Sequence, residues 1–159
     1  MKINKKVQRL FSVALSIALL ITTLPVSMLT VKAATTQFAG GSGTETDPYL
    51  IETKEQLNNV RNNLSAHYKM IADIVFTNAD FAAGGDFYNN GNGWLPIGNA
   101  DAPFIGCFDG GGKSISGLTI VAKPSETAYI GLFGYCKNAS VSNVNIINGK
   151  TEITASDDA

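Results

Sequence analysis

A short pattern recurs in the second half of the chain and limits the folds available to it. Residues 105–108 read Ile-Gly-Cys-Phe and residues 130–133 read Ile-Gly-Leu-Phe, an offset in the mid-twenties. If the alignment continues with one inserted residue, residues 115–120 fall on residues 141–146, and apolar residues recur at matching positions. A repeat of this length, with short apolar runs between Gly, Asn and Ser, is too short for a propeller blade and is typical of one β-solenoid coil.

The repeat predicts an all-β solenoid over residues 67–159. Stacked coils bury their inward side chains and pair their backbones with the coils above and below, so only the two ends keep open strand edges. Residues 151–154 begin another strand-like run shortly before the sequence ends. We therefore expect the last coil to lack a cap, as in a fragment of a longer protein.

Residues 49–66, ahead of the coils, predict a strand followed by a single helix. Thr53 and Gln56 have the spacing of a capping box, which marks the start of that helix. Three apolar residues then fall on one helix face, namely Leu57, Val60 and Leu64. We expect this short helix to cap the amino-terminal end of the solenoid. Residues 34–48 are rich in Gly, Ser and Thr and predict a flexible lead-in.

Residues 1–33 have the parts of a secretory signal peptide. A basic start precedes an apolar run over residues 10–24, and residues 31–33 supply the small-x-small pattern that a signal peptidase reads. A membrane anchor is the alternative, but the run is shorter than the roughly 20 residues that a spanning helix needs. We expect cleavage after Ala33 or Ala34. The mature protein would be secreted or held at the cell surface, and would meet the membrane only during export.

Removal of the signal peptide leaves an acidic chain whose length is that of one domain. Seven Lys and Arg side chains then stand against thirteen Asp and Glu side chains, a net charge of −6. A surface without a basic stripe does not follow a phosphate backbone, so we expect no nucleic-acid partner.

Two cysteines, Cys107 and Cys136, belong to the exported part of the chain. An oxidising compartment permits a disulfide between them. The repeat alignment, however, puts them at different strand positions, and a bridge needs closely spaced Cα atoms. We therefore expect two buried thiols.

Several segments together resemble secreted bacterial proteins that contain the GLUG motif. Residues 68–74, 94–98 and 104–120 resemble the segments that precede the motif in those proteins. The motif itself is matched by Gly131, Leu132, Phe133 and Gly134. The resemblance spans residues 49–146, and the ordered set is more specific than the motif alone. It implies a right-handed parallel β-helix in secreted or surface proteins with adhesin-like repeats or attached catalytic domains, zinc peptidases among them.

The polar residues do not predict a catalytic set. His67 is the only histidine, which excludes a zinc site with two histidines on one helix face, and we expect it at the end of the helix. The glycines at residues 110–112 lack the spacing of a phosphate loop and predict a tight turn. Sequence spacing pairs no two carboxylates as acid and base. We expect solvated turn residues at Asp73, Asp80, Asp86, Asp101 and Asp109.

The loop over residues 86–93 offers oxygen ligands for a loosely held Ca²⁺, at Asp86 and Asn90. The EF-hand spacing fails, because Tyr88 replaces a ligand and Ile97 stands where the bidentate Glu belongs. Asn and Gly also fill ordinary turns, so a simple turn is the alternative. Four aromatic residues are candidates for a sugar-stacking platform, namely Phe87, Tyr88, Trp94 and Tyr135, although Trp94 lies in an apolar run and is expected in the core.

These features predict a binding or structural module without catalytic residues or a resident cofactor. The module would be the stalk or adhesin-like region of a larger bacterial surface protein, with glycans or host matrix proteins as partners. The alternative is the non-catalytic amino-terminal part of a secreted carbohydrate-active enzyme or zinc peptidase, whose catalytic domain lies beyond residue 159.

The signal-peptide prediction can be checked by expressing the chain in a secreting bacterial host and sequencing the amino terminus of the exported protein. We expect the mature chain to begin at Ala34 or Thr35, because the peptidase cuts after the small residues of the pattern. Recovery of full-length chain in the membrane fraction, with Met1 retained, would contradict it.

Overall fold

The computed structural model describes residues 37–122 and 129–153, so the predicted signal peptide at residues 1–33 lies outside the described residues. The first elements are β1 (Tyr49–Ile51), α2 (Lys54–Asn59), the 3-10 turn η1 (Val60–Asn62), β2 (His67–Met70) and β3 (Ile74–Val75). Next come α3 (Asn78–Phe81), η2 (Asn89–Gly91), β4 (Cys107–Asp109), β5 (Ser114–Ser116) and β6 (Thr119–Ala122). The last are β7 (Ser140–Ser142), β8 (Asn145–Ile147) and β9 (Lys150–Ile153).

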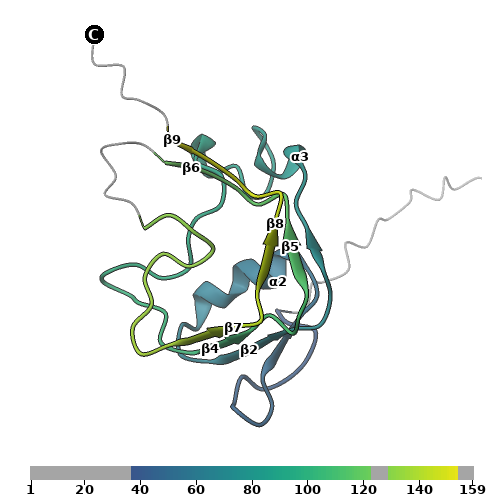
Figure 1. The fold of residues 1–159 in the computed structure, drawn as a ribbon, viewed down its shortest axis with the longest axis vertical. Helices are drawn as coiled ribbons and strands as arrows, with labels where there is room; N and C mark the ends of the chain where they lie inside the picture. The colour runs from purple at the N-terminus through teal and green to yellow at the C-terminus, as the bar shows by residue number, and fades with distance from the viewer. Residues whose placement is uncertain (1–36, 123–128, 154–159) are drawn as a thin grey trace, which may run out of the picture. The chain divides into compact units, whose positions relative to one another are not determined.

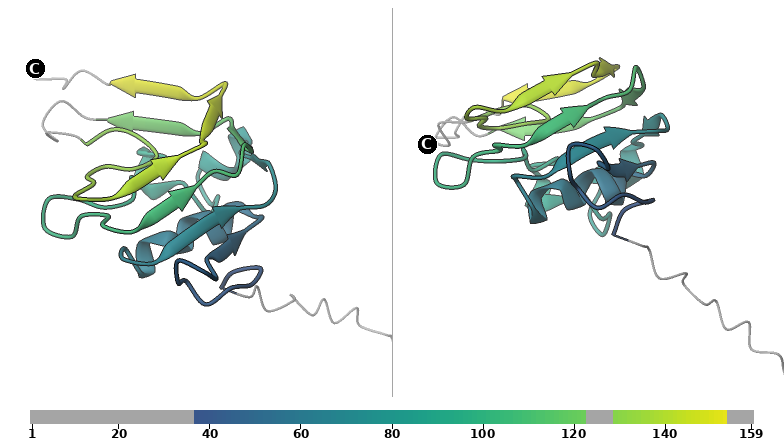
Figure 2. Two further views of the ribbon diagram at one scale, coloured as in Figure 1. Left: turned by 60° about the horizontal axis from the view of Figure 1, so that its bottom comes forward. Right: turned by 90° about the horizontal axis from the view of Figure 1, so that it is seen from below.

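The strands form three parallel sheets around one core (Figure 1). Sheet A has the order β1-β2-β4-β7, sheet B the order β3-β5-β8, and sheet C pairs β6 with β9. Each passage of the chain along these sides adds a strand next to its predecessor, so the strands stack from the amino-terminal to the carboxyl-terminal part of the chain (Figure 2). The parallel stacking is consistent with a solenoid-like fold.

The register of the sheets shows that the repeat alignment predicted from the sequence is wrong. That alignment places Ile115 on Val141, whereas in the structure Phe108 pairs with Val141 and Ile115 pairs with Ile146. Residues 105–108 and residues 130–133 are similar in sequence but lie at different places on their coils. The first segment leads into β4, whereas Phe133 forms a parallel bridge with Ile97, outside the named strands.

The core is built from the inward residue of each short strand. In sheet A, Tyr68 and Phe108 are buried on adjacent strands, and in sheet B Ile74 and Ile115 are buried in the same way. Trp94 is buried as the sequence predicts, and its indole N–H donates to the carbonyl of Leu132 at 3.1 Å. Burying these large side chains away from water stabilises the stack.

The predicted helix is present but shorter than its apolar pattern, because the last turn tightens into η1. Thr53 is the N-cap and its side chain accepts from the backbone N–H of Gln56 at 3.2 Å. The Gln56 side chain accepts from the backbone N–H of Glu52, not of Thr53 itself. Leu57 and Val60 are buried, and α2 lies at the β1 end of the stack (Figure 2).

Residues 37–48 differ from the flexible lead-in that their composition predicts. They fold back along β1, where Ala39 donates to the carbonyl of Leu50 and Leu50 donates to that of Gly40, both at 2.9 Å. Phe38 is buried and stacks on Tyr49 with ring centroids 4.4 Å apart. The buried ring of Phe38, the free edge of β1 and a backbone bond from His67 to the carbonyl of Gly43 therefore hold a segment that is otherwise polar.

The two cysteines are free thiols, as expected, but they are not buried. Cys107 is half-buried on the outer face of β4, and Cys136 is exposed. The register explains their separation, because Cys107 pairs with Ser140 while Cys136 pairs with Phe104.

No helix among the described residues is long and apolar enough to cross a membrane.

The stability of the stack is expected to depend on the inward row of sheet B. Ile115→Ala removes a fully buried side chain between Ile74 and Ile146 and should lower the free energy of unfolding by about 2–5 kcal/mol. Val75→Ala, at an exposed outward position of the same sheet, should change it by less than about 0.5 kcal/mol. Urea unfolding of both variants measures the difference, and equal effects would contradict this placement of the core.

Candidate functional site

The side of the coils that carries none of the three sheets is closed by two loops that stack on each other. Residues 94–104 form the first loop and residues 129–137 the second, and they meet through parallel bridges between Ile97 and Phe133 and between Phe104 and Cys136. Figure 1 shows these loops opposite β8 and β5. Loops held by a rigid scaffold are the usual place for binding residues, which makes this side a candidate binding surface.

The four residues of the GLUG-like motif lie in the second loop, and three of them are packing residues. Leu132 is buried, and the ring of Phe133 contacts those of Phe104 at 4.8 Å and Phe108 at 5.2 Å. Gly134 donates to the carbonyl of Ile97 at 2.9 Å, and a Cβ at Gly134 would lie 2.5 Å from the Gly98 carbonyl oxygen. Glycine is therefore required where the two loops touch. The remaining motif residue, Gly131, directly precedes these packing residues.

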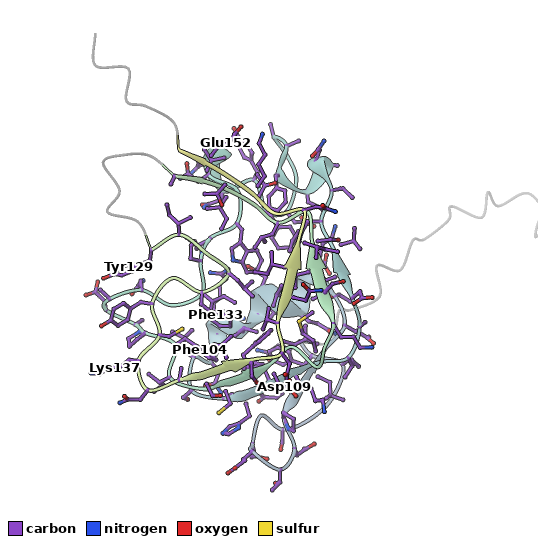
Figure 3. All side chains as sticks on the ribbon, in the orientation of Figure 1. Phe104, Asp109, Tyr129, Phe133, Lys137 and Glu152 are labelled. Carbon is purple, nitrogen blue, oxygen red and sulfur yellow. The ribbon has the colours of Figure 1, made fainter. Side chains whose placement is uncertain are left out.

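A groove runs along this side around the exposed ring of Tyr129. Two adjoining hollows of about 320 Å³ and 150 Å³ share Leu95, Pro96 and Tyr129. Tyr129 lies on the loop side of the molecule (Figure 3) and is 45% exposed. Its ring and the ring of Tyr135 form a T-shaped pair with centroids 5.2 Å apart. The Tyr129 ring is thus held by Tyr135 on one side while much of its surface stays open to solvent. We call this the Tyr129 groove.

Arg61 fixes the floor of the Tyr129 groove. Its guanidinium donates to the carbonyls of Leu95 at 2.7 Å and Pro96 at 3.5 Å, and it lies 5.3 Å from the ring centre of Trp94. Burial lowers the pKa of Arg61. The guanidinium is nevertheless stabilised by its hydrogen bonds to these carbonyls and by a cation–π contact with Trp94. The side chain thereby joins the helical end of the stack to the first loop.

The polar groups that line the Tyr129 groove are mostly amides. Asn99 is held by its own turn, because its side-chain oxygen accepts from the backbone N–H groups of Asp101 at 3.0 Å and Ala102 at 2.8 Å. Asn89 and Asn92 line the other hollow, and among the described residues no acidic side chain lines either hollow. The groove therefore offers an aromatic face, apolar carbons and neutral hydrogen-bonding groups.

Another hollow, of about 330 Å³, lies over the outer face of sheet A. His67, Cys107 and Ser140 form one cross-strand row, and Lys69, Asp109 and Ser142 form the next. His67 is the first residue of β2 and is half-buried, so its predicted place at the end of the helix is wrong. The chain has already turned into a strand at this point because η1 ends at Asn62.

Asp109 stabilises the turn between β4 and β5. It accepts from the side-chain amide of Asn143 and from the backbone N–H of Gly111, both at 2.9 Å, and these bonds lower the pKa of its carboxyl group. The glycines at residues 110–112 form the tight turn that the sequence predicts.

Asp73 and Asp80 also stabilise local backbone structure through hydrogen bonds. Asp73 accepts from the backbone N–H of Ser114 at 2.7 Å and from its hydroxyl at 3.1 Å, and these bonds lower its pKa. Burial alone would raise the pKa of Asp80, but its bonds with Lys54 and Thr77 lower it. Together, Thr77 and Asp80 make the capping box of α3, an element that was not expected from the sequence.

The predicted calcium ligands lie on the surface of the segment between α3 and Trp94. Asp86 is exposed in its turn, and Asn90 is exposed with a positive φ of 53° inside η2. In residues 37–122 and 129–153 there is no group of three or more His, Cys, Asp or Glu side chains that could hold a metal ion. Calcium binding at Asp86 and Asn90 stays a prediction.

The four aromatic residues predicted as a sugar platform do not come together. Phe87 and Trp94 are buried 5.9 Å apart in the core, Tyr88 is exposed, and Tyr135 lies against Tyr129. Tyr129 was not among the candidates, because a lone tyrosine before an apolar run is typical of the start of a strand. Only the stacking of the two loops shows that its ring lines a groove.

Comparisons with known proteins place the chain beside segments of much larger proteins. A Gly-rich membrane protein of Evansella cellulosilytica is 40% identical over 118 residues, which are 72% of this chain and 13% of that protein. Halomucin of Haloquadratum walsbyi is 30% identical over 117 residues, which are 68% of this chain and 1% of halomucin. No family model and no solved structure matches the chain. The chain is thus distantly similar to small parts of a Gly-rich membrane protein and of halomucin.

Proposed function

We propose that the mature chain is a right-handed parallel β-helix that acts as a stalk or adhesin-like binding module at the bacterial cell surface. The observation that carries this proposal is the in-register parallel stacking of the strands, which builds a rigid unit whose loops face outward. The resemblance to GLUG-motif proteins and the similarity to segments of far longer proteins both support a module within a larger surface protein.

A general rule and one feature of the molecule support this architecture. Connections between parallel strands of one sheet, as in sheet A, are almost always right-handed, because that is the hand in which twisted strands pack. At the β1 end, α2 buries Leu57 and lies beside the first strands, as a cap would.

The Tyr129 groove suits a neutral glycan. A sugar ring has an apolar face that packs on an aromatic ring, and hydroxyl groups that bond to amides such as those of Asn92 and Asn99. An acidic sugar fits less well, because Arg61 already serves backbone carbonyls and the mature chain carries a net charge of −6.

We further propose that this module is non-catalytic. The support is that Asp73, Asp80 and Asp109 are used to hold turns and a helix cap, with lowered pKa values that keep them ionised. A general acid needs the opposite shift near neutral pH.

The glycan proposal predicts that Tyr129→Ala weakens binding about tenfold or more, because the variant removes the aromatic face at the centre of the groove. The exported protein is first tested against neutral glycans, acidic glycans and matrix proteins, with and without Ca²⁺. Affinity for the best glycan is then measured by calorimetry for wild type and variants.

Tyr88→Ala is the matched control, because Tyr88 is also an exposed tyrosine but does not line the Tyr129 groove. It should bind as the wild type does. Binding confined to a matrix protein, or glycan binding that Tyr129→Ala leaves intact, would contradict the proposal.

A further inference from the structure

The larger hollow of the Tyr129 groove presents a side-chain amide of which only the donor half is free. The oxygen of Asn99 already accepts from the backbone N–H groups of Asp101 at 3.0 Å and Ala102 at 2.8 Å. These bonds fix which way round the amide lies, because an NH2 group cannot accept them. Asn99 is exposed, and among the described residues no group accepts from its NH2. Asn99 therefore offers N–H donors to a ligand and no free oxygen.

The backbone carbonyls around this hollow are already used as acceptors. Four of them accept hydrogen bonds within the protein, namely those of Leu95, Pro96, Gly98 and Ala102. The first two bind the guanidinium of Arg61, and the other two bind backbone N–H groups. A ligand in this hollow therefore gains most from an acceptor atom placed beside the Asn99 amide.

The remaining lining of the hollow is mostly apolar. Next to the ring of Tyr129 it consists of Leu64, Leu95, Pro96 and Ala102, around a volume of about 320 Å³. A chemical group that suits this lining joins a carbonyl acceptor to a methyl group, as an acetamido group does. A hydroxyl group in the same place buries no apolar carbon and is the weaker match.

We propose that the Tyr129 groove recognises N-acetylated sugars. This inference rests on the proposed glycan-binding function and names its ligand class. The acetamido carbonyl accepts from the Asn99 NH2, the methyl group packs on the apolar lining, and the apolar face of the sugar ring packs on Tyr129. Neighbouring sugars of the chain extend into the smaller hollow, which shares Leu95, Pro96 and Tyr129 with the larger one.

The test compares chitotriose with cellotriose by calorimetry on the exported protein. The two trisaccharides have the same backbone, but each unit of chitotriose carries an acetamido group where cellotriose has a hydroxyl group. Chitotriose should bind about tenfold tighter or more, because it adds an apolar contact and a stronger acceptor.

Asn99→Asp tests the donor while keeping the turn. A carboxylate can accept the same two backbone N–H bonds, but it has no N–H to donate to the acetamido group. The variant should lose most of the roughly tenfold preference for chitotriose and keep its affinity for cellotriose. A general weakening of the fold would lower both affinities together.

Asn92→Asp is the matched control, because it makes the same change of charge but lines only the smaller hollow. It should keep the preference for chitotriose. Circular dichroism and thermal unfolding check that both variants are folded as the wild type is.

The results separate this inference from the function on which it rests. Equal affinities for the two trisaccharides, or binding of other neutral glycans but not of chitotriose, would overturn the inference alone. A preference that survives Asn99→Asp, or that Asn92→Asp abolishes equally, would also overturn it. Failure of the folded protein to bind any neutral glycan would overturn the proposed function as well.

Discussion

The structure depends on the stacking of short parallel strands in one register, with apolar side chains placed above one another inside the coil. The described strands are two to four residues long, and strands this short are not stable alone. Ile115 is buried only because Ile74 lies on one neighbouring strand and Ile146 on the other. The exposure of Val141 and Ile146 shows what happens to the same rows at the end of the stack.

The stacking also places the loops on which the proposed function rests. Bridges at Ile97 and Phe104 align the two loops beside Tyr129, and Arg61 holds the first loop through its carbonyls. Several carboxylates considered as catalytic acids or bases instead stabilise turns between strands, as Asp73 and Asp109 do. The frame and the groove thus use different residues, so groove residues can change without altering the coils.

Features set by neighbours in sequence could be predicted, whereas features set by the coil register could not. The N-cap at Thr53, the glycine turn and the buried Trp94 follow from local chemistry and apolar runs. The coil period could not be predicted in this way, because the coils differ in length. In sheet A, far more residues separate Tyr68 from its partner Phe108 than separate Tyr49 from its partner Tyr68. Loops of unequal length make such a repeat difficult to recognise in the sequence. The groove at Tyr129 could not be predicted either, because two loops far apart in sequence form it.

The most direct test of this account is a disulfide placed by the register. In a chain whose Cys107 and Cys136 are replaced by serine, Ser116→Cys with Ile147→Cys joins partners on neighbouring strands, about 4.8 Å apart, a spacing that suits a bridge. Ser116→Cys with Ser142→Cys follows the repeat alignment that the structure rejects. We predict rapid oxidation of the first pair and little of the second on a non-reducing gel. A bridge that forms only between residues 116 and 142 would contradict the stacked register.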